Sequence, residues 1–232
     1  MTTPKTHSGT PRGVRSRVIL AAMLAPLSGC GMQGGAMLYM LGVGQGRKIE
    51  AQFKLSEGPI LIFIDDVHER VDWPAANRHL FNELSQELLR NKAAKKIIPD
   101  ETLDQLKQTV PDFPKKSCRE LGELAGASQV IWIEAQDYLG EPDVFEASRA
   151  AYFSVTVKVV DPNQKSDRNL IRLWPASSDG QPVAVSLTGA RVAEAKSKDG
   201  ISKILAEKLA GEIAKLFYEH RADDFEKKDE YQ

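Results

Sequence analysis

The sequence predicts an α/β fold of mixed α+β type, in which helices pack on a sheet with both parallel and antiparallel strands. Two observations predict it. In the first half of the folded part, short apolar strands alternate with segments of helical period, and in the second half several strands with alternating polarity follow one another. The expected element order is β-α-β-α-α-β-β-β-β-α over residues 58–219.

The first three elements form a predicted β-α-β unit. Residues 60–64 are an unbroken apolar run, which is typical of a central strand buried on both faces. Residues 74–92 carry apolar side chains on one helical face, and Pro74 stands in the first turn, where its missing N–H costs little. Residues 96–98 supply a second strand. A crossover of this kind is right-handed and joins parallel strands.

Two shorter helices are expected next, at residues 101–109 and 117–126. The second begins with Ser117-Cys118-Arg119-Glu120, a capping box in which Ser117 and Glu120 each satisfy a backbone N–H of the other. Gly126 suits the residue just beyond the end of this helix.

The second half of the domain is predicted to be mainly antiparallel. Residues 130–133 form the next apolar strand, and residues 152–159 alternate apolar and polar side chains as a half-exposed strand does. Further strands are expected at 170–174 and, at the edge of the sheet, at 183–187. A long helix over 201–217 places apolar side chains on one stripe that suits a sheet face.

The N-terminus has the arrangement of an export signal. Three arginines precede an apolar stretch at residues 18–27, which is too short to span a bilayer. The stretch ends in Leu27-Ser28-Gly29-Cys30, which resembles the lipobox of bacterial lipoproteins. The resemblance implies that Cys30 becomes the acylated first residue of the mature chain, with palmitate-type chains that anchor it to the membrane. An ordinary secretory signal with an incidental cysteine is the alternative.

This interpretation divides the chain into four parts. They are a lipoprotein signal peptide (1–29), a lipid anchor and flexible tether (30–57), a single α/β domain (58–219) and a charged tail (220–232). Gly31 follows the cysteine at the position where some bacteria use Asp to retain lipoproteins at the inner membrane. We therefore expect the periplasmic face of the outer membrane as the location.

Charge and cysteine content argue against nucleic-acid binding and against cysteine-based catalysis. The leader holds four basic residues and no acidic ones, so the mature part has 27 basic and 32 acidic residues, a net charge of −5. Such a composition does not favour nucleic acid as a partner. Besides Cys30 the chain has only Cys118. We expect this thiol to be buried on a helix rather than catalytic, because no motif places a partner residue beside it.

A helix carrying Glu120-Leu121-Gly122 that leads into the strand entry Gly126-Ala127-Ser128-Gln129-Val130 resembles a group of periplasmic lipoprotein domains. The group contains the curli secretion channel subunit, the penicillin-binding-protein activator lipoprotein and the N-terminal domain of the Tol-Pal propeller protein. Ser128 stands where that motif has aspartate. The resemblance covers residues 58–218, and it implies binding and assembly without transferring a catalytic residue.

A second resemblance is the Leu173-Trp174-Pro175 turn, which is similar to one in planctomycete lipoproteins of unknown activity.

Three residues form the one candidate for catalysis. Asp65, Asp66 and His68 follow the first predicted strand, at the end of the sheet where α/β proteins bind ligands. Two carboxylates and an imidazole could hold a divalent metal, so a metal-dependent hydrolase is the alternative function. Acidic residues at this place also serve as helix-entry caps. His79 and Glu83, four apart on the first helix, favour a surface hydrogen bond over a zinc site.

The leading hypothesis is a non-enzymatic, lipid-anchored envelope protein that acts in envelope assembly or secretion. No catalytic motif and no cofactor motif is recognised. We expect it to bind an envelope protein or peptidoglycan through a sheet edge and the loop at 137–150, and a homo-oligomer stays open. Aromatic side chains pack cores or anchor interfaces, and both roles stay open for five of them, Trp132, Trp174, Tyr138, Tyr152 and Phe145.

Overall fold

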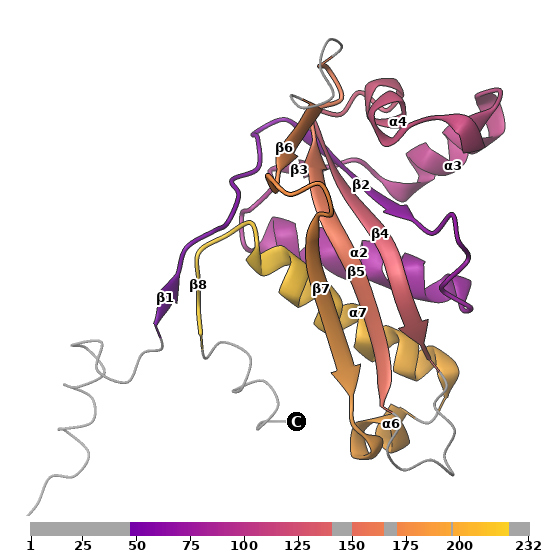
Figure 1. Ribbon diagram of the computed structural model, residues 1–232, viewed down its shortest axis with the longest axis vertical. Coiled ribbons are helices and arrows are strands. Elements are labelled where there is room, and N and C mark those ends of the chain that lie inside the picture. Colours follow the sequence, from indigo (N-terminus) through magenta and orange to yellow (C-terminus); the bar gives the residue numbers. More distant parts are fainter. Residues whose placement is uncertain (1–46, 141–149, 165–170, 196, 223–232) are drawn as a thin grey trace, which may run out of the picture. The chain divides into compact units, whose positions relative to one another are not determined.

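The computed structural model describes residues 47–140, 150–164, 171–195 and 197–222. The elements in chain order are β1 (Lys48–Ile49), β2 (Pro59–Asp65), α2 (Pro74–Arg90), β3 (Lys96–Ile97), α3 (Asp100–Thr109), η1 (Phe113–Lys115), α4 (Cys118–Leu124), β4 (Gln129–Leu139), β5 (Ala151–Val160), β6 (Arg172–Trp174), β7 (Gln181–Leu187), α6 (Gly189–Ala195), α7 (Lys198–Lys215) and β8 (His220–Arg221) (Figure 1). The predicted fold class, a mixed α+β domain, is confirmed.

Six strands form the main sheet, in the order β3-β2-β4-β5-β6, with β7 also paired to β5. Strand β2 pairs in parallel with β3 and β4, as the predicted β-α-β unit requires. Strand β5 pairs antiparallel with β4, β6 and β7. Strands β6 and β7 share one side of β5, because β7 pairs with residues 151–157 and β6 with residues 159–160. The mixed parallel and antiparallel sheet is therefore as predicted.

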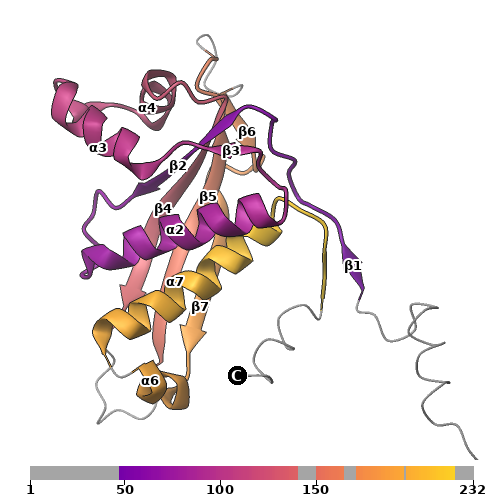
Figure 2. The same ribbon diagram turned by 180° about the vertical axis from the view of Figure 1, so that it is seen from behind.

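One face of this sheet is covered along its length by α2 and α7, which cross it together (Figure 2). The side chains buried here alternate along the strands, as in Ile60 and Ile62 of β2 and Phe153, Val155 and Val157 of β5. Their partners on the helices are equally apolar and include Leu80, Leu84, Leu205, Leu209 and Ile213, each with no exposed surface. This layer is the main core, and the periods of 2 and of 3.6 that predicted it arise from its packing.

The opposite face, turned toward the viewer in Figure 1, is covered only at one end. There α3 and α4 pack on Leu61, Val130 and Val160, with Leu103 and Cys118 as their buried side chains. Helix α4 approaches β4 closely. A Cβ on Gly122 would lie 2.4 Å from Val130 Cγ2, so only glycine permits this contact.

Three features differ from the expected elements. Strand β4 continues to Leu139, well beyond residue 133, with a register shift between Ala135 and Asp137. A short helix, α6, precedes the final helix. Strands β1 and β8 pair antiparallel, although their residues were expected in the tether and the charged tail. Two-residue strands show no periodicity, so this pairing left no signal in the sequence.

Candidate functional site

The uncovered part of the second face contains a cleft of about 920 Å³, which we name the α4 cleft. The sheet supplies its floor through Phe63, Asp65, Trp132, Lys158 and Val160. Segment η1 and helix α4 supply one wall through Phe113, Lys116, Cys118, Arg119 and Leu121. Ile171 and Arg172, at the start of β6, line it as well. Its volume lies within the range of about 300 to 1,000 Å³ that is usual for small-molecule sites.

Trp132 is held in the floor by polar neighbours. Its indole N–H donates a hydrogen bond of 3.1 Å to Asp65 Oδ2 on the adjacent strand. The ammonium of Lys158 lies 4.6 Å from the centre of a Trp132 ring, within the range of a cation–π contact. Lys158 also forms an ion pair with Glu134. These contacts fix the indole, so the floor is a preformed surface.

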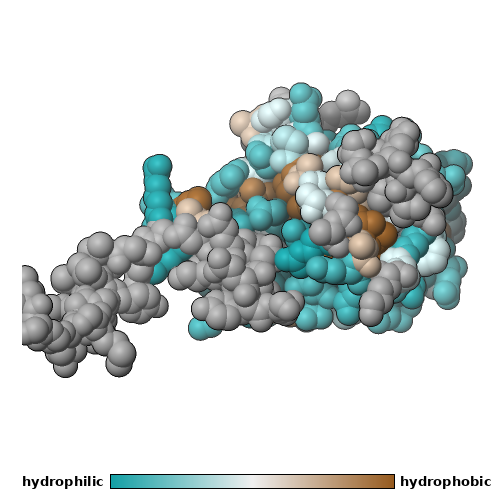
Figure 3. All heavy atoms as spheres, turned by 90° about the horizontal axis from the view of Figure 1, so that it is seen from below, coloured by the Kyte–Doolittle hydropathy of each residue, from teal (hydrophilic) through white to brown (hydrophobic). Residues whose placement is uncertain are grey.

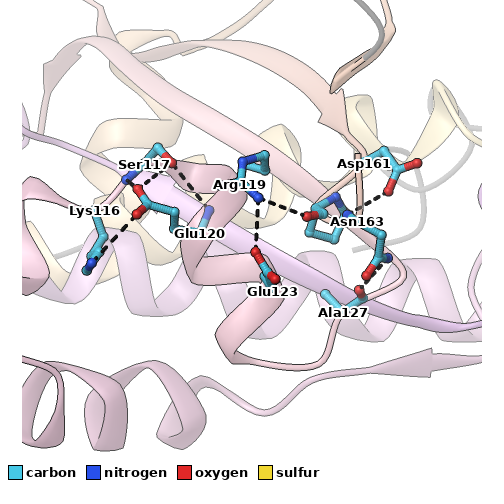
Figure 4. A network of polar contacts seen from close by, with 9 residues as sticks. Lys116, Ser117, Arg119, Glu120, Glu123, Ala127, Asp161 and Asn163 are labelled. Carbon is cyan, nitrogen blue, oxygen red and sulfur yellow. Dashed lines mark hydrogen bonds and ion pairs between the residues drawn. The ribbon is translucent and has the colours of Figure 1, made fainter. Parts of the chain in front are cut away.

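The capping box predicted at the start of α4 is present (Figure 4). The backbone N–H of Ser117 donates to Glu120 Oε2 at 2.9 Å, and the backbone N–H of Glu120 donates to Ser117 Oγ at 3.3 Å. The hydrogen bonds from the backbone and side chain of Ser117 lower the pKa of the Glu120 carboxyl. Gly126 follows the helix with φ of +69°, as expected.

Two further contacts tie α4 and the loop after it to the loop that follows β5 (Figure 4). Arg119 Nη1 pairs with Glu123 at 3.0 Å and approaches the carbonyl of Pro162 at 3.4 Å. Asn163 Nδ2 donates to the carbonyl of Ala127, also at 3.4 Å. These contacts join α4, which supplies the wall of the cleft, to the loop after β5, a strand that supplies part of its floor.

Cys118 of α4 lines the cleft and is 9% exposed, which confirms that it is buried on a helix. Burial is the largest cause that raises the pKa of its thiol, and the nearby carboxylates of Asp65 and Glu134 add to it. The thiol is protonated at neutral pH, and a protonated thiol is a poor nucleophile.

The structure brings together only two of the three residues of the candidate metal site. Asp66 accepts backbone N–H bonds from Arg70 and Val71 through its two carboxylate oxygens, at 2.8 and 3.2 Å, so it caps its own loop. Asp65 and His68 line a small cleft of about 120 Å³, which Asp66 does not line. Among the described residues, no group of three or more His, Cys, Asp or Glu side chains is placed to hold a metal ion.

The pair expected within α2 forms differently. His79 Nε2 lies 3.2 Å from Asp199 Oδ1 on α7 rather than bonding to Glu83. Asp199 also accepts a bond from the Trp73 indole at 3.3 Å. These hydrogen bonds lower the pKa of Asp199. The prediction of a His79–Glu83 pair was wrong because α7, which the helical spacing does not reveal, brings a carboxylate to the imidazole.

The predicted aromatic residues have separate positions. Tyr138 is buried, and its ring packs in an edge-to-face arrangement with that of Phe153, with 5.1 Å between the ring centroids. Trp174 packs against Phe53 and Phe217 at 6.4 and 6.0 Å. Of the five aromatic side chains, only Trp132 lines the α4 cleft, and Phe145 lies outside the described residues. Nothing in the sequence distinguished Trp132, since its strand neighbours on both sides are equally apolar.

The predicted lipidation residue, Cys30, and most of the tether lie outside the described residues, as do residues 141–149 of the predicted contact loop. None of the helices in the described ranges combines the length and the apolar composition that a membrane span requires.

Comparison with known protein families found no family model that matches the chain, and comparison with curated proteins found no match. Solved structures show limited similarity. The PelC dodecamer from Paraburkholderia phytofirmans is 12% identical, with a TM-score of 0.39 over 74% of this chain and 96% of that one. Lipoprotein GNA1162 from Neisseria meningitidis is 15% identical, with a TM-score of 0.41 over 67% of this chain and 97% of that one.

A third structure, the hypothetical protein CT253 from Chlamydia trachomatis, is 15% identical. Its TM-score is 0.37, over 68% of this chain and 94% of that one. Similarity at this level assigns neither a family nor a function. The resemblance to the curli, penicillin-binding-protein activator and Tol-Pal domains accordingly stays a prediction.

Proposed function

We propose that this chain is a lipid-anchored protein of the bacterial cell envelope that binds a partner and catalyses no reaction. The partner is an envelope protein or peptidoglycan, and the role is in envelope assembly or secretion. The observation that carries the proposal for the folded domain is the unequal covering of the sheet, because part of one face and the edge formed by β7 are left available for contact.

The anchor is supported by the sequence around Cys30. A basic segment, a short apolar stretch and the lipobox-like Leu27-Ser28-Gly29-Cys30 occur in the order that lipoprotein export requires. Two or more acyl chains bind stably where a single chain gives only marginal membrane binding. Anchoring of this kind needs no membrane-spanning helix. The proposed place is the periplasmic face of the outer membrane, on the basis of Gly31.

The contact surface is supported by strand β7. It pairs with β5 on one side and is the outermost described strand at its end of the sheet. Pro182, Ala184 and Ser186 on it are exposed and point to the uncovered face, while Val183, Val185 and Leu187 turn to the core. Proline is found almost only on edge strands, since it cannot donate a ladder hydrogen bond. This edge and the predicted contact segment at 137–150, whose first three residues belong to β4, are the proposed contact.

The alternative, a metal-dependent hydrolase that uses Asp65, Asp66 and His68, is not favoured. The Asp66 carboxylate is engaged with the backbone of its own loop, and Asp65 accepts the indole N–H of Trp132. Calorimetric titration with Mg²⁺, Ca²⁺, Mn²⁺ and Zn²⁺ separates the two functions. Saturable binding that Asp65→Asn abolishes would restore the hydrolase and count against the proposal.

The anchor is tested by mass spectrometry of the N-terminal peptide from the protein purified out of its natural membrane. We expect a peptide that starts at Cys30 and carries fatty acyl mass. The control is Cys30→Ser. In a two-phase extraction this variant should partition into the aqueous phase, whereas the parent should partition into the detergent phase. A peptide that retains Met1, or an unmodified Cys30 thiol, would disprove the anchor.

A further inference from the structure

The α4 cleft is lined by both apolar and basic side chains. Four basic residues line it, namely Lys116, Arg119, Lys158 and Arg172, against one acidic residue, Asp65. The chain as a whole has a net charge of −1, so this distribution is local. The coloured residues seen from below in Figure 3 are mainly hydrophilic, with smaller apolar areas between them. The lining of the cleft thus places apolar side chains beside basic ones.

Arg172 differs from the other three cations. Lys116, Arg119 and Lys158 each have a carboxylate partner, which lowers their capacity to hold a further anion; the partners are Glu120, Glu123 and Glu134. Arg172, in contrast, donates to the carbonyl of Ala176 at 3.3 Å, and the described residues give it no carboxylate. A guanidinium has five N–H donors in a planar fork that matches a carboxylate. Most of the hydrogen-bonding capacity of Arg172 is thus available.

The apolar part of the cleft lies within the same site. Phe63 and Trp132 are the aromatic side chains of its floor, and Ile171 is the residue next to Arg172. Val67, which also lines the cleft, is 77% exposed. An exposed valine beside an apolar floor extends the surface that a hydrocarbon could cover, and covering it is favourable by about 25 cal/mol per Å² of apolar area.

We propose that the α4 cleft binds an amphiphile with a single hydrocarbon chain and a terminal carboxylate, of the fatty-acid type. The hydrocarbon lies on Phe63, Trp132 and Ile171, and the carboxylate accepts a bidentate pair of hydrogen bonds from Arg172. The guanidinium of Arg172, which has no carboxylate among the described residues, selects an anionic head, and the volume of about 920 Å³ suits a small molecule. This inference goes beyond the proposed function and does not require the anchor.

The experiment uses the full chain with Cys30→Ser, so that no acyl chain of its own can enter the cleft. Dodecanoate, below its micellar concentration, is titrated by calorimetry beside dodecyltrimethylammonium, which has the same chain and a cationic head. We expect saturable binding of one dodecanoate, at least about tenfold tighter than the cationic analogue, because hydrogen bonds between two ionised groups are about twice as strong as neutral ones. Absent binding, or equal binding of the two probes, would overturn the proposal.

Two variants locate the ligand. Arg172→Gln should weaken dodecanoate binding about tenfold while binding of the cationic analogue does not fall. The matched control is Arg47→Gln, which removes an exposed arginine that does not line the cleft and should change neither affinity. If Arg172→Gln binds dodecanoate as tightly as the parent, the carboxylate is not held as proposed.

A fluorescence measurement tests the apolar half of the site separately. The chain has three tryptophans, and a dodecanoate that carries bromine on its chain quenches those it contacts. We expect quenching that is largely lost in Trp132→Phe and kept in Trp174→Phe, because Trp174 packs on Phe53 and Phe217 instead. Unchanged quenching in Trp132→Phe would place the ligand elsewhere and overturn the proposal.

Discussion

The two faces of the central sheet differ in what covers them. Helices α2 and α7 cover one face along its length, and Phe153, Leu205 and Leu209 are fully buried there. Helices α3 and α4 cover only one end of the other face, beyond which lie the α4 cleft and a row of polar side chains. Stability is thus concentrated on the first face, and the second is left to provide a binding surface.

The polar row follows the alternation of the strands. On the uncovered face, Gln136 Nε2 donates to Thr156 Oγ1 at 2.8 Å, and the Tyr152 hydroxyl donates to Asp137 Oδ2 at 2.9 Å. Arg70 Nη1 donates to the carbonyl and the side-chain oxygen of Gln136 at 2.8 and 3.0 Å. Side chains that bond to each other in this way keep a solvated sheet face ordered without a covering helix.

The largest expected effect of a single change falls on the covered face. Leu209→Asp places a carboxylate where Leu209 is 0% exposed, and a buried unpaired charge costs several kcal/mol against a typical total stability of about 5 to 15 kcal/mol. We expect the domain to unfold, as measured by the loss of a cooperative thermal transition. The control is Leu124→Asp on α4, where the leucine is 50% exposed and little change is expected. An unaltered melting curve for Leu209→Asp would show that α7 does not cover the sheet.

A second comparison uses one aromatic residue from each face. Phe153→Ala removes a fully buried ring from the covered face and should cost about 3 to 5 kcal/mol of the free energy of unfolding. Phe63→Ala removes a ring that borders the α4 cleft, so less buried contact is lost and the cost should be smaller. Urea denaturation of both variants measures the two losses in free energy of unfolding and shows which is larger. Equal losses would mean that the cleft face is packed as tightly as the helix-covered one.

The smallest expected effect concerns the capping box at the wall of the cleft. The pKa of Glu120 is lowered in the folded state by its bonds to Ser117, so its contribution to stability is present above the unfolded value of about 4.3 and is lost as the pH falls through the folded value. The stability difference between the parent and Glu120→Gln should therefore be constant near pH 7 and shrink in acid. Denaturant unfolding between pH 7 and pH 3 measures it.

Ser117→Ala is the background that checks this cause. It removes the Ser117 hydroxyl that donates to the Glu120 carboxylate, and it leaves the Ser117 backbone N–H that donates to the same carboxylate. The pH-dependent part of the Glu120→Gln difference should become smaller in that background. A difference of the same size would assign the lowered pKa to the backbone N–H of Ser117 or to Lys116 rather than to the Ser117 hydroxyl.

Periodicity predicted the elements of the covered face because those side chains face a single apolar layer. Leu80, Leu84 and Leu88 recur at helical spacing and are all fully buried, and the odd-numbered residues of β5 face the same core. The capping box was readable because its two partners are three residues apart. In both cases the determining contacts are local or repeat along the chain.

The site was not predictable in the same way. The α4 cleft joins Phe63, Phe113, Trp132 and Arg172, which come from four separate segments and share no spacing. The two acidic residues of the predicted metal site have different partners. Asp65 accepts a hydrogen bond from the Trp132 indole, whereas Asp66 accepts one from the backbone of its own loop. Relations of this kind depend on how α4 is placed over the sheet, a tertiary property that the sequence pattern does not encode.

The most direct test of the central claim is site-specific photo-crosslinking in the living cell, with a photoreactive amino acid placed on one side of the domain or the other. One probe replaces the exposed Ala184 of β7, at the uncovered face, and the other replaces the exposed Gln86 on the outer side of α2. We predict a discrete crosslinked product from position 184 and none from position 86. Crosslinks from position 86 alone, or equal products from both, would contradict the assignment of binding to the face that the helices leave open.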